Sequence, residues 1–179
     1  NVNGVWTSYI DCLFTSVSAT CVTGLVVFDT ASYWSYFGQF IILLLIQIGG
    51  LGVVTISLLG LIFVGKKVGI QQRSLMQDSI SAHQVGGIVK LTLFILKITL
   101  IIELLGALFM FSVFYTDFGV LGIWKSVFHS ISAFCNAGFD LLGSVENKFC
   151  SLTGYSSNII LNIVIMFLML TNKFNKKKK

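Results

Sequence analysis

The longest uncharged stretch of the chain, residues 40–64, limits the folds that are open to it. It reads "FIILLLIQIGGLGVVTISLLGLIFV" and contains no acidic or basic residue. A bilayer core of roughly 30 Å is crossed by about 20 apolar residues in a helix. The whole chain is 55% hydrophobic and only 11% charged, far from the balance of a soluble domain. We therefore expect an all-α membrane protein with a first span here.

Two further segments are apolar enough to be spans. Residues 91–115 form the second, although Lys97 and Glu103 interrupt it and must face protein or water instead of lipid. These two residues are six apart and do not share a helix face, so we expect each to pair with another element. The third span runs from near Ser157 to Leu170, which is short for a full crossing. We expect the sequence to stop inside this span, and to begin after a cut, because it opens without an initiator Met or a signal peptide.

The basic residues predict the orientation of these spans. Nine of the 12 lie in residues 65–90 and 173–179, and these segments are assigned to the cytoplasm because Lys and Arg stay with cytoplasmic loops. The opposite face carries most of the acids, among which Asp29 and Asp140 are assigned to an outer vestibule that concentrates cations. Positive-inside topology alone would produce the same distribution, so both explanations stay open.

A short segment occurs twice on the predicted outer face. Residues 14–24 read "FTSVSATCVTG" and residues 128–138 read "FHSISAFCNAG", with six of 11 positions identical. In each, Phe, a β-branched residue and Cys recur at i, i+3 and i+7, which is one face of a helix. Each segment ends in Gly, whose backbone takes conformations closed to other residues. Each also precedes an apolar span by a short polar link.

A short helix followed by an irregular glycine-containing strand is tolerated at membrane depth only where protein buries it or where it lines a water-filled cavity. The C-terminal end of such a helix favours a cation. The strand beyond it turns carbonyl oxygens inward to replace the water shell of an ion. The repeat therefore predicts two re-entrant pore loops. The alternative is a pair of ordinary amphipathic helices that pack against the spans.

Four motifs give the chain a family resemblance: "CLFTSVSATCVTGLVVFDT", "FGQFIILLLIQIGGLGVVT", the basic "GKKVGIQQR" and "VFHSISAFCNAGF". The chain resembles the Trk/Ktr/HKT superfamily of potassium transporters, most closely the membrane subunit of bacterial Ktr systems. The resemblance implies four repeats of helix, pore loop and helix around one potassium-channel-like pore. Residues 1–65 would supply the first repeat without its leading helix, residues 66–90 a cytoplasmic connection, and residues 91–179 the second repeat.

The resemblance also assigns an ion selectivity filter, in which backbone carbonyl oxygens bind potassium. Its candidate residues are Cys21, Val22, Thr23, Gly24, Cys135, Asn136, Ala137 and Gly138. In the family, Gly at the filter position goes with potassium selectivity, and Ser in the first repeat goes with sodium passage. The family more often has other small residues in place of Cys21 and Cys135, and small size explains both better than thiol chemistry.

The expected function is potassium uptake across the cell membrane, with potassium as the transported substrate and no covalently bound cofactor. The resemblance implies a homodimer and a cytosolic nucleotide-binding regulatory subunit that docks on Lys66, Lys67 and Arg73. These three residues lie in the cytoplasmic connection, residues 66–90, whose simpler role is to return the chain to the membrane. Nucleic acid is not an expected partner. The alternative function is a truncated, non-conducting fragment of such a subunit.

Other residues have simpler explanations than chemistry. The four cysteines show no CxxC and no nearby pair of histidines, and nothing between the spans supplies a nucleophile with its base, so we expect no enzyme. We expect His129 to have a hydrogen-bonded packing role. "QIGGLG", residues 47–52, follows no strand and lies within a span, so its glycines are expected to let helices pack closely.

Overall fold

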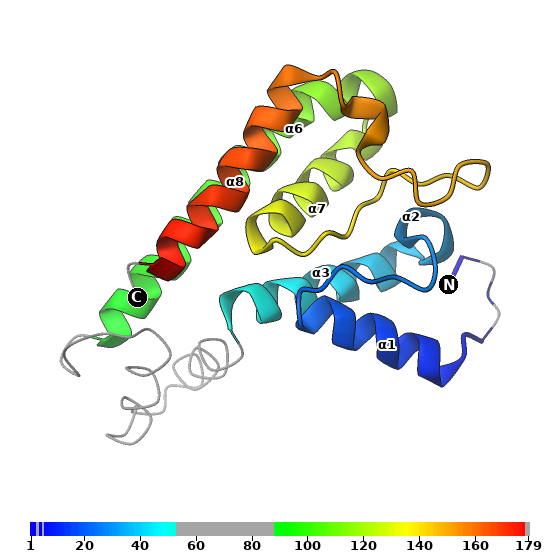
Figure 1. Cartoon of the computed structure of the whole chain (residues 1–179), viewed down its shortest axis with the longest axis horizontal. Helices are drawn as coiled ribbons and strands as arrows, with labels where there is room; N and C mark the ends of the chain where they lie inside the picture. Colours follow the sequence, from blue (N-terminus) through cyan, green and yellow to red (C-terminus); the bar gives the residue numbers. More distant parts are fainter. Residues whose placement is uncertain (3, 5, 53–87, 178–179) are drawn as a thin grey trace.

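The computed structural model describes residues 1–2, 4, 6–52 and 88–177. The described residues form helices and irregular segments and contain no β-strand, which confirms the prediction of an all-α protein (Figure 1). The elements are α1 (Tyr9–Thr20), α2 (Thr30–Tyr33), α3 (Tyr36–Leu51), α6 (Ile88–Phe118), α7 (Leu121–Cys135), the 3-10 helix η1 (Thr153–Tyr155) and α8 (Ile159–Lys177).

The helices pack in two groups that share α7. Helices α6 and α8 run side by side, and α7 packs against both of them (Figure 1). Helix α3 lies between α7 and α1 and contacts each. Helix α7 is thus enclosed by three longer helices, and α1 rests on α3.

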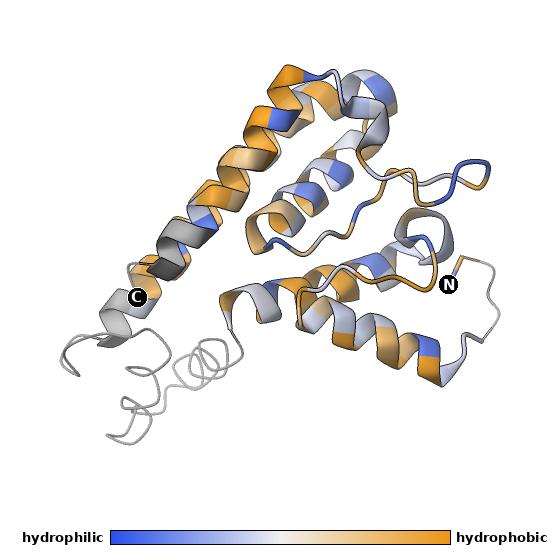
Figure 2. Cartoon of the chain, viewed as in Figure 1, coloured by the Kyte–Doolittle hydropathy of each residue, from blue (hydrophilic) through white to orange (hydrophobic). Residues whose placement is uncertain are grey.

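Helix α6 matches the second predicted span. Its segment Thr92–Phe118 has 27 residues and contains an 18-residue window with a mean hydropathy of 2.3. Among the described residues it is the one helix that is long and apolar enough to cross a membrane. The apolar stretches Tyr36–Leu51 and Ile159–Asn172 are shorter. Figure 2 shows that the coloured part of α8 is mostly hydrophobic, whereas α7 carries more polar residues. Leu104 and Leu108 are among the large apolar side chains that α6 leaves exposed, a surface suited to lipid.

The first predicted span differs from the structure. Helix α3 begins at Tyr36, after Ser35 caps it by accepting a hydrogen bond from the Gly38 N–H (3.4 Å). It ends at Leu51 because Gly52 has a φ of 90°, which a helix does not allow. The prediction of one unbroken helix over residues 40–64 is therefore wrong at Gly52. The rest of that span, like Lys66, Lys67 and Arg73 of the predicted docking surface, lies outside the described residues.

The third predicted span is α8, which begins at Ile159 and continues past Leu170 to Lys177. Its first turn is capped by Asn158, whose Oδ1 accepts a hydrogen bond from the Leu161 N–H (3.0 Å).

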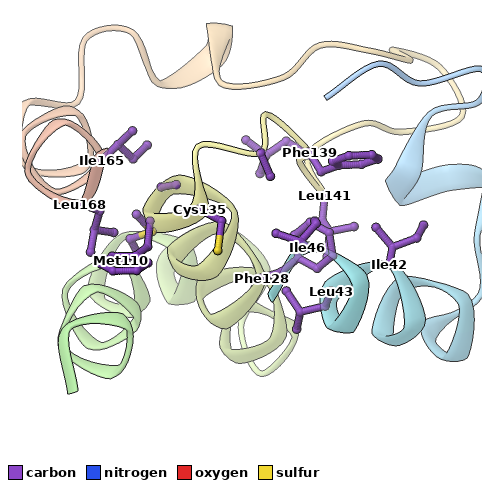
Figure 3. Packing of buried hydrophobic residues seen from close by; sticks show 14 of the residues in the cluster. Ile42, Leu43, Ile46, Met110, Phe128, Cys135, Phe139, Leu141, Ile165 and Leu168 are labelled. Carbon is purple, nitrogen blue, oxygen red and sulfur yellow. The ribbon is translucent and has the colours of Figure 1, made fainter. Parts of the chain in front are cut away.

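The hydrophobic core joins α7 to its three neighbours. Figure 3 shows Leu43 and Ile46 of α3 beside Phe128 of α7, and Leu168 of α8 near Met110 of α6. Phe128, Ile46 and Met110 are fully buried. This packing fixes the position of α7 and of the loop that follows it.

Candidate ion-conducting site

The first repeated segment folds as a helix followed by a tight reversal. After α1, the N–H of Val22 donates to the carbonyl oxygen of Ala19 (3.2 Å) and the N–H of Thr23 donates to that of Ser18 (3.0 Å). These two bonds, with Val22 in the left-handed region (φ 57°), make a Schellman motif. The hydroxyls of Ser18 and Thr23 also share a hydrogen bond of 2.9 Å, which ties the end of the helix to the strand.

The second repeated segment ends its helix in the same way. After α7, the N–H of Asn136 donates to the carbonyl oxygen of Ala133 (3.1 Å) and the N–H of Ala137 donates to that of Ser132 (2.8 Å). Asn136 is left-handed with a φ of 59°. The Ser132 hydroxyl donates to the carbonyl oxygen of Phe139 (2.6 Å) and so holds the strand beyond the turn.

The glycines that follow also correspond. Gly24 has a φ of 74° and Gly138 a φ of 76°, values that side chains other than Gly rarely adopt. The two segments therefore share helix, turn and strand geometry position by position. Residues 14–24 and 128–138 are therefore similar in backbone conformation as well as in sequence.

The two strands lie against each other. A methyl group on Gly24 would lie 2.5 Å from the carbonyl oxygen of Ala137, and one on Gly138 would lie 3.5 Å from the Cα atom of Gly24. Gly24 therefore needs its missing side chain both for its φ and for this close approach. The structure brings together both glycines of the candidate filter, at the C-terminal ends of α1 and α7, where a cation is electrostatically favoured.

The two candidate filter cysteines occupy different surroundings. Cys21 is exposed, whereas Cys135 is 3% exposed and donates through its Sγ to Oε1 of Gln47 (3.9 Å). Neither cysteine forms a disulfide bond. No group of three His, Cys, Asp or Glu side chains in the described part of the chain could hold a metal ion. The filter role of all eight residues stays a prediction.

Comparison with known proteins decides the family. A family model described as "TrkH: Cation transport protein" matches residues 4–175. The chain belongs to the TrkH family. The resemblance noted in the sequence is thereby confirmed, and the family is one of transport proteins, not enzymes.

Three curated relatives of this TrkH-family chain are potassium uptake proteins by name. "Potassium/sodium uptake protein NtpJ" of Enterococcus hirae is 41% identical over 169 residues, which is 94% of this chain and 36% of that protein. "Ktr system potassium uptake protein B" of Bacillus subtilis is 41% identical over 165 residues (92% and 36%), and the protein of the same name from Vibrio alginolyticus is 36% identical over 143 residues (79% and 31%). The chain spans about a third of the length of these relatives.

The two acids assigned to an outer vestibule have structural contacts in this TrkH-family chain. Asp29 is 5% exposed; its Oδ2 accepts from the N–H (2.8 Å) and hydroxyl (2.7 Å) of Ser32, and its Oδ1 accepts from the N–H of Phe149 (3.0 Å). It thus caps α2 and ties it to the loop before η1. Asp140 accepts from the N–H of Leu142 (3.0 Å). The vestibule role of both acids stays a prediction.

Burial raises the pKa of the Asp140 carboxyl group. The hydrogen bond from Leu142 opposes this rise, and the neighbouring Asp29 carboxylate adds to it. Asp140 therefore loses its negative charge at a higher pH than an ordinary aspartate does.

A polar pair between helices was not identified from the sequence. Nε2 of Gln47 on α3 donates to both carboxylate oxygens of Glu103 on α6 (3.1 Å each). The Ser130 hydroxyl of α7 donates to the backbone oxygen of Glu103 (2.6 Å). Glu103 does pair with another element, as expected. The signal for its partner was available, because Gln47 is the most polar residue of an uncharged apolar run.

His129 supports the second loop from behind. Its Nδ1 lies 2.7 Å from the carbonyl oxygen of Lys125, and its Nε2 accepts a hydrogen bond from the N–H of Leu141 (3.3 Å). The ring is 3% exposed and packs against Phe114. The predicted hydrogen-bonded packing role is confirmed, and it joins α7 to the segment beyond Gly138.

Proposed function

We propose that this chain forms part of the membrane subunit of a potassium uptake system and contributes two segments of its selectivity filter. The observation that carries the proposal is the paired loop geometry: two helices end in the same reversal, and Gly24 and Gly138 meet beyond them. Membership of the TrkH family and the names of the relatives support potassium as the substrate.

The proposed mechanism involves no chemical step. Potassium sheds part of its water shell, and backbone carbonyl oxygens of the candidate filter strands replace it. The C-terminal ends of α1 and α7 add partial negative charge at the same place. Passage is driven by the ion gradient and the membrane potential. One relative is named for both potassium and sodium, so discrimination between these ions is the property most worth measuring.

The proposal includes the arrangement that the family resemblance implies. The chain lies in the cell membrane with several crossings and with both filter loops on the outer side. It works as a homodimer, and a cytosolic nucleotide-binding subunit docks on Lys66, Lys67 and Arg73. Charge reversal at these three residues should then abolish co-purification of that subunit, and its persistence would argue against docking there.

Potassium uptake is tested with the full-length protein that contains this chain, in cells that lack their own uptake systems. We expect growth at low external potassium and accumulation of rubidium as a tracer. A protein that reaches the membrane in normal amount but supports neither would contradict the proposed function.

A further inference from the structure

Helix α3 lies between α1 and α7, the two candidate pore helices. Two adjacent glycines of α3 each face one of them. A methyl group on Gly49 would lie 2.7 Å from the carbonyl carbon of Thr20. A methyl group on Gly50 would lie 2.7 Å from Cβ of Cys135. Cβ atoms essentially never come within 3.0 Å of a heavy atom elsewhere in the chain, outside their own residue and its neighbours. A side chain at either position therefore requires a pore helix to move.

These contacts involve atoms that cannot rotate away. Thr20 is the last residue of α1, and Gly49 meets its backbone. Cys135 is the last residue of α7, and Gly50 meets its Cβ, with the Cα only 3.4 Å from the same position. A rotamer change moves Sγ but not Cβ. Any displacement would pass directly into the turns at Val22 and Asn136, which lead into the strands.

A hydrogen-bonded side chain reinforces the second contact. Gln47 lies one turn before Gly50, and its Oε1 accepts a hydrogen bond from Cys135 Sγ (3.9 Å). Its Nε2 is bound to Glu103 of α6, which fixes the amide. Since Ser130 of α7 also binds Glu103, helices α3, α6 and α7 form a closed set of contacts around Cys135.

We propose that residues 47–50 of α3 are positioning residues for ion discrimination: they set the spacing between the two candidate filter strands by seating the last residue of each pore helix. This inference rests on the proposed function and names the part of α3 on which the selectivity between potassium and sodium depends. Close packing at "QIGGLG" thus has a consequence for the ions that pass, beyond holding helices together.

The test uses the full-length protein and the ratio of potassium to sodium uptake at equal amounts in the membrane. A displacement of about 1 Å can lower a rate on the order of 100-fold where groups must be held in a fixed geometry. We therefore expect Gly50→Ala to lower the ratio of potassium to sodium uptake by about tenfold. The matched control is Gly38→Ala on the same helix, whose methyl group would lie 3.3 Å from the Trp34 side chain and should change little.

A second measurement does not depend on transport. In a protein whose other cysteines are replaced by serine, the rate at which a membrane-permeable maleimide labels Cys135 reports whether its sulfur stays buried. We expect Gly50→Ala to raise this rate severalfold and Gly38→Ala to leave it unchanged. If Gly50→Ala reaches the membrane in lower amount, the labelling rate of the protein that is inserted still tests the contact.

An unchanged ion ratio in Gly50→Ala at normal membrane levels would overturn the inference. Unchanged labelling of Cys135 would overturn the seating contact itself. An unsubstituted protein that carries no potassium would instead overturn the proposed function and the selectivity role with it, and the labelling would still decide the contact.

Discussion

The backbone of Val22 is the most unusual conformation in the candidate site. A β-branched residue with a φ of 57° is a genuine outlier, and the left-handed region costs a non-glycine residue roughly 1–2 kcal/mol. Its counterpart in the second repeat is Asn136, a residue type that tolerates this region. Such strain persists where the surrounding structure enforces it, and it clusters at functional sites.

Replacing Val22 with the residue of the second repeat should relieve this strain. We expect Val22→Asn to raise the free energy of unfolding by about 1 kcal/mol, measured by thermal unfolding in detergent. The control is Val27→Asn, at an exposed position without a positive φ, which should have no such effect. A lower free energy of unfolding in Val22→Asn would mean that the packing of the valine side chain stabilises the fold by more than its backbone strain destabilises it.

The raised pKa of Asp140 predicts a pH dependence if this residue serves the outer vestibule. The charged carboxylate attracts cations, and a raised pKa means that the charge is lost earlier as the external pH falls. Potassium uptake at limiting concentration should therefore decline on mild acidification. Asp140→Asn should show lower uptake at neutral pH and little further decline. A decline that persists unchanged in Asp140→Asn would assign it to another group.

Some residue-level features follow from the sequence and others do not. The positive φ of Gly24 and Gly138 was anticipated because glycine lacks the Cβ that forbids it. The conformation of Val22 was not, since a β-branched residue normally indicates extended backbone. The structural contacts of Asp29 also escaped prediction, because Ser32 and Phe149 are donors that only the folded chain brings together.

At the scale of helices, the hydrogen bonds between Gln47 and Glu103 link α3 to α6. Glu103 is 4% exposed, so removing its partner leaves buried polar groups unsatisfied. We expect Gln47→Ala to lower the free energy of unfolding by about 1–3 kcal/mol. The exchange Gln47→Glu/Glu103→Gln keeps one amide and one carboxylate in the pair and should recover most of this loss in denaturant unfolding. An exchange no more stable than Gln47→Ala would show that the pair is not the source of the effect.

Hydropathy predicted where helices run better than where they end. Residues 91–115 became α6 because apolar composition over that length is sufficient for a helix of this kind. The end of α3 was missed because hydropathy stays high beyond Gly52, whereas the φ of that residue decides the boundary. The partner of Glu103 was also missed, since it lies 56 residues away on another helix. Helix α2, only four residues long, depends on its cap Asp29 more than on any periodic pattern.

At the scale of the whole molecule, one helix supports two loops. Helix α3 contacts both α1 and α7, and α7 is enclosed by α3, α6 and α8 (Figure 1). The internal repeat in the sequence anticipated two equivalent loops, because matching residues impose matching turns. Periodicity could not show that the loops touch, since that depends on how the helices pack. The contact between Gly24 and Gly138 is thus the finding that the structure adds to the sequence.

The most direct test of the central claim is the ratio of potassium to sodium flux through the purified full-length protein in liposomes, with and without Gly24→Ser. A side chain at residue 24 would meet the carbonyl oxygen of Ala137 and would oppose a φ of 74°, so the strand must change. If Gly24 belongs to the filter, Gly24→Ser raises sodium flux relative to potassium. An unchanged ratio, in a protein inserted in normal amount, would contradict the assignment of these loops as the filter.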